Sequence, residues 1–330
     1  MQVLSASQSC GAERVKVHTA NDSFRSLYRR RDLIALASLF LGAAGSAPLV
    51  SDPGLVDPYD EAREARLYGR EQPFIALYRR APYVLGVVAS VHSVDPSSKT
   101  FASIDRAFDL VRPAIVILEG FPTTWGKNPE RILAHIPHRN DPGASSYARG
   151  ECVHAASLAV DRGVEFCGGE LTDRELIGSL VQQGYDAQDI FYAAMFGPLA
   201  QDARAGDFTG PTDLRFAPAF DKWARNLRPD YPASVDTSFT GFQAWFARIY
   251  GRPLDSDPDW ADHGGPGEPE IAGQIGKASN LLRDQYVVGL MIRLLNERQR
   301  VLTVFGGSHL SSQWRALKAA LGSPRLIGHG

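Results

Sequence analysis

Four polar side chains stand directly after apolar runs of the kind found in buried strands. They are His92, Glu119, Glu170 and His309. In an open α/β sheet, ligands bind outside the carboxyl ends of the strands, so these residues are expected to meet at one edge. Neutral imidazoles and carboxylates bind Zn, Mn, Co or Fe, and the same groups act as general acids and bases without a metal.

Each of these residues also has a purely structural interpretation. A histidine at a strand end often bonds a backbone group, and Glu119 can accept backbone N–H bonds. Glu170 can pair with Arg174 on the following helix. The recurrence of a strand, small residues and a histidine in both halves of the chain favours a functional role for His92 and His309.

Arg283 is the fifth candidate. It shares a helix face with Asn280 and either orients a substrate carbonyl or carboxylate, or pairs with Glu119 or Glu170. A surface cation is the structural alternative. Serine catalysis at Ser308 is disfavoured because the nucleophile-elbow pattern Gly-x-Ser-x-Gly is absent.

The elements that must position these residues alternate between strand and helix. The four strands that lead to them are predicted at 83–91, 114–118, 164–167 and 300–305. Helices are predicted at 101–111, 151–161, 172–183, 186–200, 274–299 and 313–321.

This order predicts a single α/β domain over 71–330, with a mixed, largely parallel sheet and helices on both faces. A strand at 73–78 forms an N-terminal hairpin with the strand at 83–91. Residues 201–273, rich in Pro, Gly, Asp, Trp and Phe, are predicted to be a helical and loop insertion that caps the functional edge.

Two stretches resemble the TraB/GumN/TIKI family, in which a hairpin leads to a Gly-x-x-His motif, a helix and a strand ending in Glu. Pro73 to Glu119 follows that order, and Ala89-Ser90-Val91-His92 matches the motif except for Ala89. The family closes with an Arg-Asn pair on a helix, an apolar strand and a second Gly-x-x-His. Here Arg283-Asp284 stands for the pair, and Gly306-Gly307-Ser308-His309 matches fully.

The resemblance implies the fold of erythromycin-esterase-like and ChaN-like proteins and, for some members, metal-dependent hydrolysis of peptides. It therefore predicts a hydrolase of peptides or esters that uses Mn, Co or Zn, or a His/Glu acid–base pair, with His92, His309, Glu119 and Glu170 as ligands. Asp284 replaces the family's amide by a charge. A fold does not fix function, so a non-catalytic haem or small-ligand carrier remains the alternative.

The N-terminus is typical of an export signal. Arg29-Arg30-Arg31 precedes a short apolar run and small residues up to Ala47, which indicates a twin-arginine signal over residues 1–47 and a periplasmic or secreted protein. The apolar run is too short to span a bilayer, so no stable membrane insertion is expected after cleavage. Residues 48–70 are predicted to be a polar tether.

Composition bounds the partners and the redox state. The chain of 330 residues has a formal net charge of -2 and no basic stripe, which disfavours a nucleic-acid surface. A peptide or small-molecule substrate is expected instead. After removal of the signal, Cys152 and Cys167 remain, and the sequence leaves open whether they form a disulfide or stay as free thiols.

Overall fold

The computed structural model describes residues 47–68, 72–141, 143–144, 146–204 and 206–328. The export signal predicted over residues 1–47 lies outside this part of the chain, apart from Ala47. Among the described helices, none combines the length and apolar character that a membrane span requires.

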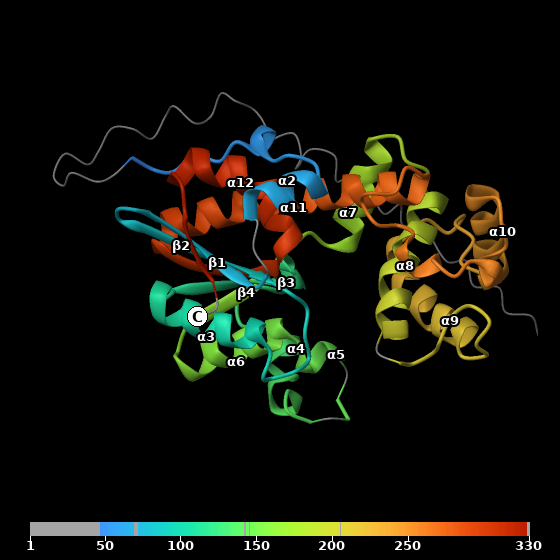
Figure 1. Ribbon diagram of the computed structural model, residues 1–330, viewed down its shortest axis with the longest axis horizontal. Coiled ribbons are helices and arrows are strands. Elements are labelled where there is room, and N and C mark those ends of the chain that lie inside the picture. Colours follow the sequence, from blue (N-terminus) through green and yellow to red (C-terminus); the bar gives the residue numbers. More distant parts are fainter. Residues whose placement is uncertain (1–46, 69–71, 142, 145, 205, 329–330) are drawn as a thin grey trace, which may run out of the picture. The chain divides into compact units, whose positions relative to one another are not determined.

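A six-stranded mixed sheet forms the centre of the domain (Figure 1). The strands are β1 (Phe74–Arg80), β2 (Tyr83–Ser90), β3 (Ile115–Pro122), β4 (Glu165–Glu170), β5 (Arg300–Gly306) and β6 (Arg325–Gly328). They are ordered β4-β3-β5-β2-β1-β6, with the first four parallel and β1 antiparallel to both of its neighbours. The predicted fold class and the N-terminal hairpin are thereby confirmed.

Helices cover both faces of the sheet because its parallel strands are apolar on both sides. On one face, α3 (Lys99–Val111) and α6 (Glu151–Asp161) pack against a core that includes Val88, Leu118 and Phe166. On the other face, α11 (Ile271–Arg298) and α12 (Gly307–Leu321) pack against a second core that includes Ala89 and Ile117.

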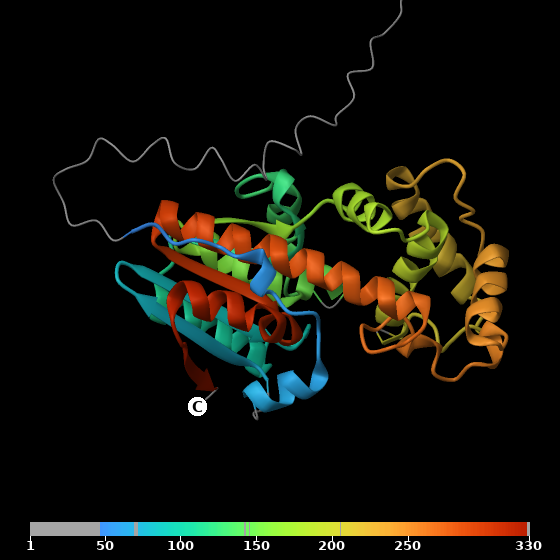
Figure 2. The ribbon, with the colours of Figure 1, turned by 90° about the horizontal axis from the view of Figure 1, so that it is seen from above.

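A third core lies in a separate helical region that we define as residues 173–270. Its main helices are α7 (Asp173–Gln182), α8 (Ala187–Arg204), α9 (Phe216–Leu227) and α10 (Phe239–Tyr250). Aromatic side chains such as Phe191, Phe242 and Trp245 fill this core, and Ala272 and Ile275 of α11 complete it. Figure 2 shows α11 as one continuous helix that extends from the sheet into this region.

The helical region begins earlier than the cap predicted over 201–273. Thr172 caps α7: its side chain accepts a hydrogen bond from the Glu175 N–H, and the Glu175 carboxylate accepts one from the Thr172 N–H. This capping box starts the helical region immediately after β4. The sequence located α7 and α8 correctly but did not assign them to the same core as residues 201–273.

The segment expected to be a tether lies against the domain instead. It contains a short 3-10 helix, η1 (Pro53–Leu55), and α2 (Glu61–Tyr68). Leu49 and Val56 are buried and belong to the core cluster that includes α11 and α12, and the Leu49 backbone exchanges two hydrogen bonds with the Asn296 side chain. The apolar pairs Leu49-Val50 and Leu55-Val56 are the signal that the sequence interpretation missed.

The two remaining cysteines are free. Cys167 lies in the core under α11, whereas Cys152 packs on the opposite face with the residues beneath α6. Alternate residues of a strand point to opposite faces, so the register of β4 directs Cys167 away from α6. The disulfide considered from the sequence is therefore not formed.

Candidate functional site

The carboxyl edge of the parallel strands carries the four polar residues in a row. The strand order β4-β3-β5-β2 places Glu170, Glu119, His309 and His92 in that sequence along the edge. Arg283 is contributed by α11, which crosses above them. The structure thus brings together the predicted set from five separate elements.

Glu119 is the hub of the cluster. Its Oε2 accepts a hydrogen bond from the Gly306 N–H at 2.5 Å. Its Oε1 lies 3.3 Å from His309 Nε2 and 3.4 Å from Arg283 Nη2. The left-handed backbone of Gly120, with φ of 80°, lets β3 bulge directly after this glutamate, and the Gly120 N–H donates to Glu170.

Arg283 joins the two glutamates. Its Nη2 donates to Glu170 Oε1 at 2.5 Å and its Nε to Glu170 Oε2 at 2.8 Å, a two-point pairing. Its Nη1 donates to Asn280 Oδ1 at 3.4 Å. Glu170 therefore pairs with Arg283 and not with Arg174, which lies 3.7 Å from Asp230.

His309 is a buried histidine held by two carboxylates. It lies in the first turn of α12, which begins at Gly307 rather than at the predicted Gln313. Its Nδ1 lies 2.9 Å from Asp284 Oδ1, and the Gln313 amide donates to the same oxygen at 2.6 Å. The imidazole therefore has a carboxylate partner at each nitrogen.

His92 forms a second carboxylate–histidine pair. Its Nδ1 lies 2.5 Å from Glu151 Oε1, at the start of α6. The Glu151 side chain is buried, whereas 73 % of the His92 side chain is exposed. Because an ionised carboxylate only accepts hydrogen bonds, Nδ1 carries the proton, and Nε2 is left for a substrate or a water molecule.

Both histidines face the same point of the backbone. A methyl group built on Gly306 would lie 3.5 Å from Glu119 Oε2, 3.7 Å from His92 Nε2 and 3.8 Å from His309 Cδ2. The two imidazoles and Glu119 thus all lie within 4 Å of one point next to Gly306. This proximity is compatible with a shared site.

The charges of the cluster reinforce one another. Burial alone would lower the pKa of His309, but Asp284 and Glu119 raise it to about 10. Burial alone would raise the pKa of Glu119, yet His309 and Arg283 hold it well below its usual range. Burial would also lower the pKa of Arg283, but Glu170 and Glu119 raise it above the ordinary value. At neutral pH the cluster thus contains an ionised Glu119 between an imidazolium and a guanidinium.

The pKa of His92 is raised mainly by a different carboxylate from those that act on His309. The hydrogen bond to Glu151 is the main cause that raises the pKa of His92. Glu119 and His309 act on the same ring with opposite signs, which again places His92 next to the cluster.

The donor set suits a divalent cation in chemistry, although not in its present arrangement. In metal sites a ligating histidine commonly donates its other ring N–H to a carboxylate, as His92 does to Glu151 and His309 to Asp284. Within the described residues, however, no three His, Cys, Asp or Glu side chains are already arranged around one ion position. Arg283 and the His309 ring instead occupy Glu119 Oε1, so a cation would have to displace them.

Sequence reasoning missed the groups that orient the two histidines. Glu151 was read only as the start of a helix, and Asp284 only as a departure from an Arg-Asn pair. Gln313, which was predicted to begin the last helix, lies inside it and bonds Asp284. The signal that could have found Asp284 is an acidic residue among the apolar residues on the buried face of a helix.

Three further histidines lie in other parts of the structure. His154 lies 2.9 Å from Asp105, and His263 lies 2.9 Å from Asp257 within the helical region. His138 ends a short 3-10 helix in the loop-rich segment. These three histidines make no contact with the cluster around Glu119 among the described interactions.

Comparison with known proteins adds no relative. No family model, no curated protein and no solved structure matches the chain.

Proposed function

We propose that this protein is an exported hydrolase of the TraB/GumN/TIKI type that cleaves ester or peptide bonds with a His/Glu acid–base cluster. The observation that carries the proposal is the convergence of two carboxylate-bound histidines, Glu119 and Arg283 around Gly306. A carrier would need an apolar cavity but no converging ionised groups. Burial of such groups costs free energy, so their presence together favours a functional role.

The geometry suggests distinct roles for the two histidines. His92 Nε2 accepts a proton from a water molecule, while Glu151 holds the ring and stabilises its charged form. The hydroxide attacks the substrate carbonyl, and negative charge develops on the carbonyl oxygen. Arg283 and the protonated His309 supply positive charge for that oxygen. When the carbonyl forms again, the C–O or C–N bond breaks and His92 gives its proton to the leaving alcohol or amine. Release of the carboxylic acid restores the starting state.

Glu119 positions the cationic half of this site. It bonds His309, Arg283 and the Gly306 N–H at once. Its negative charge lies between the two cations. Without it, their mutual repulsion would cost several kcal/mol, on the order expected for close charges in a low-dielectric site.

A metal-assisted version is the second candidate, favoured by the carboxylate anchoring of both histidines. His92, His309, Glu119 and Glu170 would hold Mn, Co or Zn. A bound divalent ion would lower the pKa of a water molecule towards neutrality. Elemental analysis of the purified protein, and activity before and after treatment with a chelator, distinguish the two versions.

The non-catalytic alternative is a haem or small-ligand carrier on the same fold. It is supported by the apolar pocket described below, which reaches Arg283. Haem binding would appear as a Soret absorption band on titration of the purified protein, whereas the hydrolase should show none.

The test uses chromogenic esters and amino-acid anilides with the mature chain. Glu119→Gln keeps shape and removes charge, so hydrolysis should fall by about 10²-fold or more, as for other electrostatic groups of active sites. His309→Ala should do the same while the fold is kept. Glu297→Gln, an exposed site on α11, is the matched control and should retain full activity. Full activity in both Glu119→Gln and His309→Ala would show that the cluster is not the reaction centre.

A further inference from the structure

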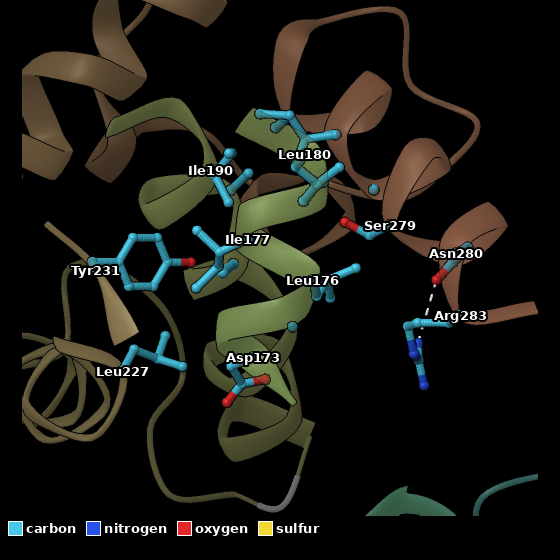
Figure 3. Close-up of a pocket in the computed structure, with 17 residues that line it drawn as sticks. Asp173, Leu176, Ile177, Leu180, Ile190, Leu227, Tyr231, Ser279, Asn280 and Arg283 are labelled. Carbon is cyan, nitrogen blue, oxygen red and sulfur yellow. Dashed lines mark hydrogen bonds between the residues drawn. The ribbon is translucent and has the colours of Figure 1, made fainter. Parts of the chain in front are cut away.

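A pocket of about 300 Å³ lies between α7, α8 and α11 and ends at the cluster (Figure 3). Leu176, Ile177 and Leu180 of α7 form one wall, and Ile190 of α8 lies next to them. In Figure 3, Ser279, Asn280 and Arg283 of α11 line the opposite side. The pocket is thus built by the helical region on one side and by the helix that carries Arg283 on the other.

Small residues keep this space open between the larger apolar side chains. Ala193, Ala194, Gly197 and Ala272 all line it. Gly276 also lines it, and a side chain there would collide with the Gly264 carbonyl oxygen. The interior therefore has room for an inserted chain and few groups that would hydrogen-bond to it.

Charge within the lining is confined to two side chains. Asp173 lies at the start of α7, and Arg283 faces Glu170 and Glu119 on its other side. Arg283 is already paired with Glu170 and Glu119, so it attracts an anionic group less strongly than a free guanidinium would. Apolar lining residues dominate the remainder, and burial of hydrocarbon is their main contribution to binding.

We propose that this pocket holds the hydrocarbon chain of an acyl ester or acyl amide substrate, whose carbonyl lies at Arg283. The inference rests on the proposed hydrolase function and specifies its substrate class. Arg283 belongs both to the pocket lining and to the Glu119 cluster, so a chain that fills the pocket ends at the groups that would polarise its carbonyl. Short acyl groups leave the apolar walls in contact with water.

A chain-length series tests the proposal. In the intact mature protein, kcat/KM for p-nitrophenyl acetate, butyrate, hexanoate and octanoate should rise by up to about fourfold for each buried methylene. Two variants fill the pocket from facing walls: Ala194→Leu on α8 and Ser279→Leu on α11. Either should abolish the rise with chain length. Lys277→Leu adds the same side chain at an exposed site of α11 outside the pocket and should keep the rise.

Binding separates this inference from the proposed function. Calorimetry with acetate and decanoate should show tighter binding of decanoate to the unmodified chain, and Ala194→Leu should remove that difference. Hydrolysis that is independent of chain length, with no effect of either filling variant, would overturn the pocket assignment and leave the hydrolase intact. Tight decanoate binding without hydrolysis of any ester would contradict the hydrolase and retain the pocket as a lipid-chain site. Equal binding of acetate and decanoate would overturn the inference.

Discussion

The two carboxylate–histidine pairs have the same chemistry but different surroundings. Asp284 and His309 are both almost fully buried, with the His309 side chain 8 % exposed. In the other pair the carboxylate of Glu151 is buried, but 73 % of the His92 side chain meets solvent. The buried pair behaves as a fixed charge, whereas the exposed pair has access to solvent and can exchange protons with it. One constellation can therefore supply both a permanent cation and a reactive base.

The largest effect is expected from removal of the reactive base. His92→Ala should lower kcat by about 10²–10⁴-fold, the range for general acid–base groups, because His92 Nε2 faces the space next to Gly306 and is the proposed base. The free energy of unfolding should fall by no more than about 1 kcal/mol, because the ring is mostly exposed and its removal lets water reach Glu151. Kinetics on the best ester substrate, together with urea denaturation, measure both. Unchanged kcat would assign the base to the other pair.

Asp284 and Glu151, the carboxylates of the two pairs, should differ in their effect on the free energy of unfolding, and here the buried pair should show the larger effect. Asp284→Ala leaves the buried His309 imidazolium without its closest partner and should lower the free energy of unfolding by about 3–5 kcal/mol. Glu151→Ala leaves an exposed ring that water can solvate, so a cost of no more than about 1 kcal/mol is expected. Urea denaturation of the two variants gives the comparison directly. Equal losses would mean that burial does not separate the pairs.

The space between the pairs is tested by Gly306→Ala. The φ of Gly306 is -53°, which any residue adopts, and the new methyl would make ordinary contacts at 3.5–3.8 Å with Glu119, His92 and His309. The protein should therefore fold with near-normal stability. Hydrolysis should nevertheless fall by about 10²-fold, because the methyl displaces the water or carbonyl from its position. An active Gly306→Ala enzyme would place the reaction elsewhere.

The smallest and most gradual effect is expected in the pH dependence of the free energy of unfolding. The pKa of His309 is raised to about 10 from an ordinary 6.5, so its stabilising charge is fully present below pH 6.5 and is lost as the pH rises through 10. In chelator-treated protein, the free energy of unfolding should fall over this window. His309→Gln should show a smaller fall, since groups that titrate identically in both proteins cancel. Parallel curves for the two proteins would show that the buried histidine is uncharged.

The sequence predicted the sheet and the cluster well for one physical reason. The long apolar runs before His92, Glu119 and His309 are specific for strands buried on both faces, and parallel strands bring their carboxyl ends to one edge. The tether and the start of the last helix were predicted wrongly. Both depend on which distant surface a short segment meets, as Leu49 meets Asn296.

The orienting partners were harder to predict because they depend on side-chain direction. Glu151 and Asp284 lie on helices, where a neighbouring position along the turn would point away from the site. Periodicity alone does not specify helix rotation about its own axis to the accuracy that a hydrogen bond requires. The same limit applied to a strand: the sequence did not show which face of the sheet Cys167 would point to, and it points away from Cys152.

The continuity of α11 links the pocket to the Glu119 cluster, and in the proposed hydrolase it would couple substrate selection to the reaction centre. This helix has 28 residues, and its first half lines the pocket while Arg283 and Asp284 bond the cluster. Each residue advances an α-helix by about 100°, so one residue inserted or deleted between Ser279 and Arg283 would rotate one function out of phase with the other. Loops of the helical region are free of this constraint. Substitutions on α7 and α8 could therefore change which substrates the pocket accepts. The spacing of residues along α11, in contrast, must stay constant for both functions to be kept.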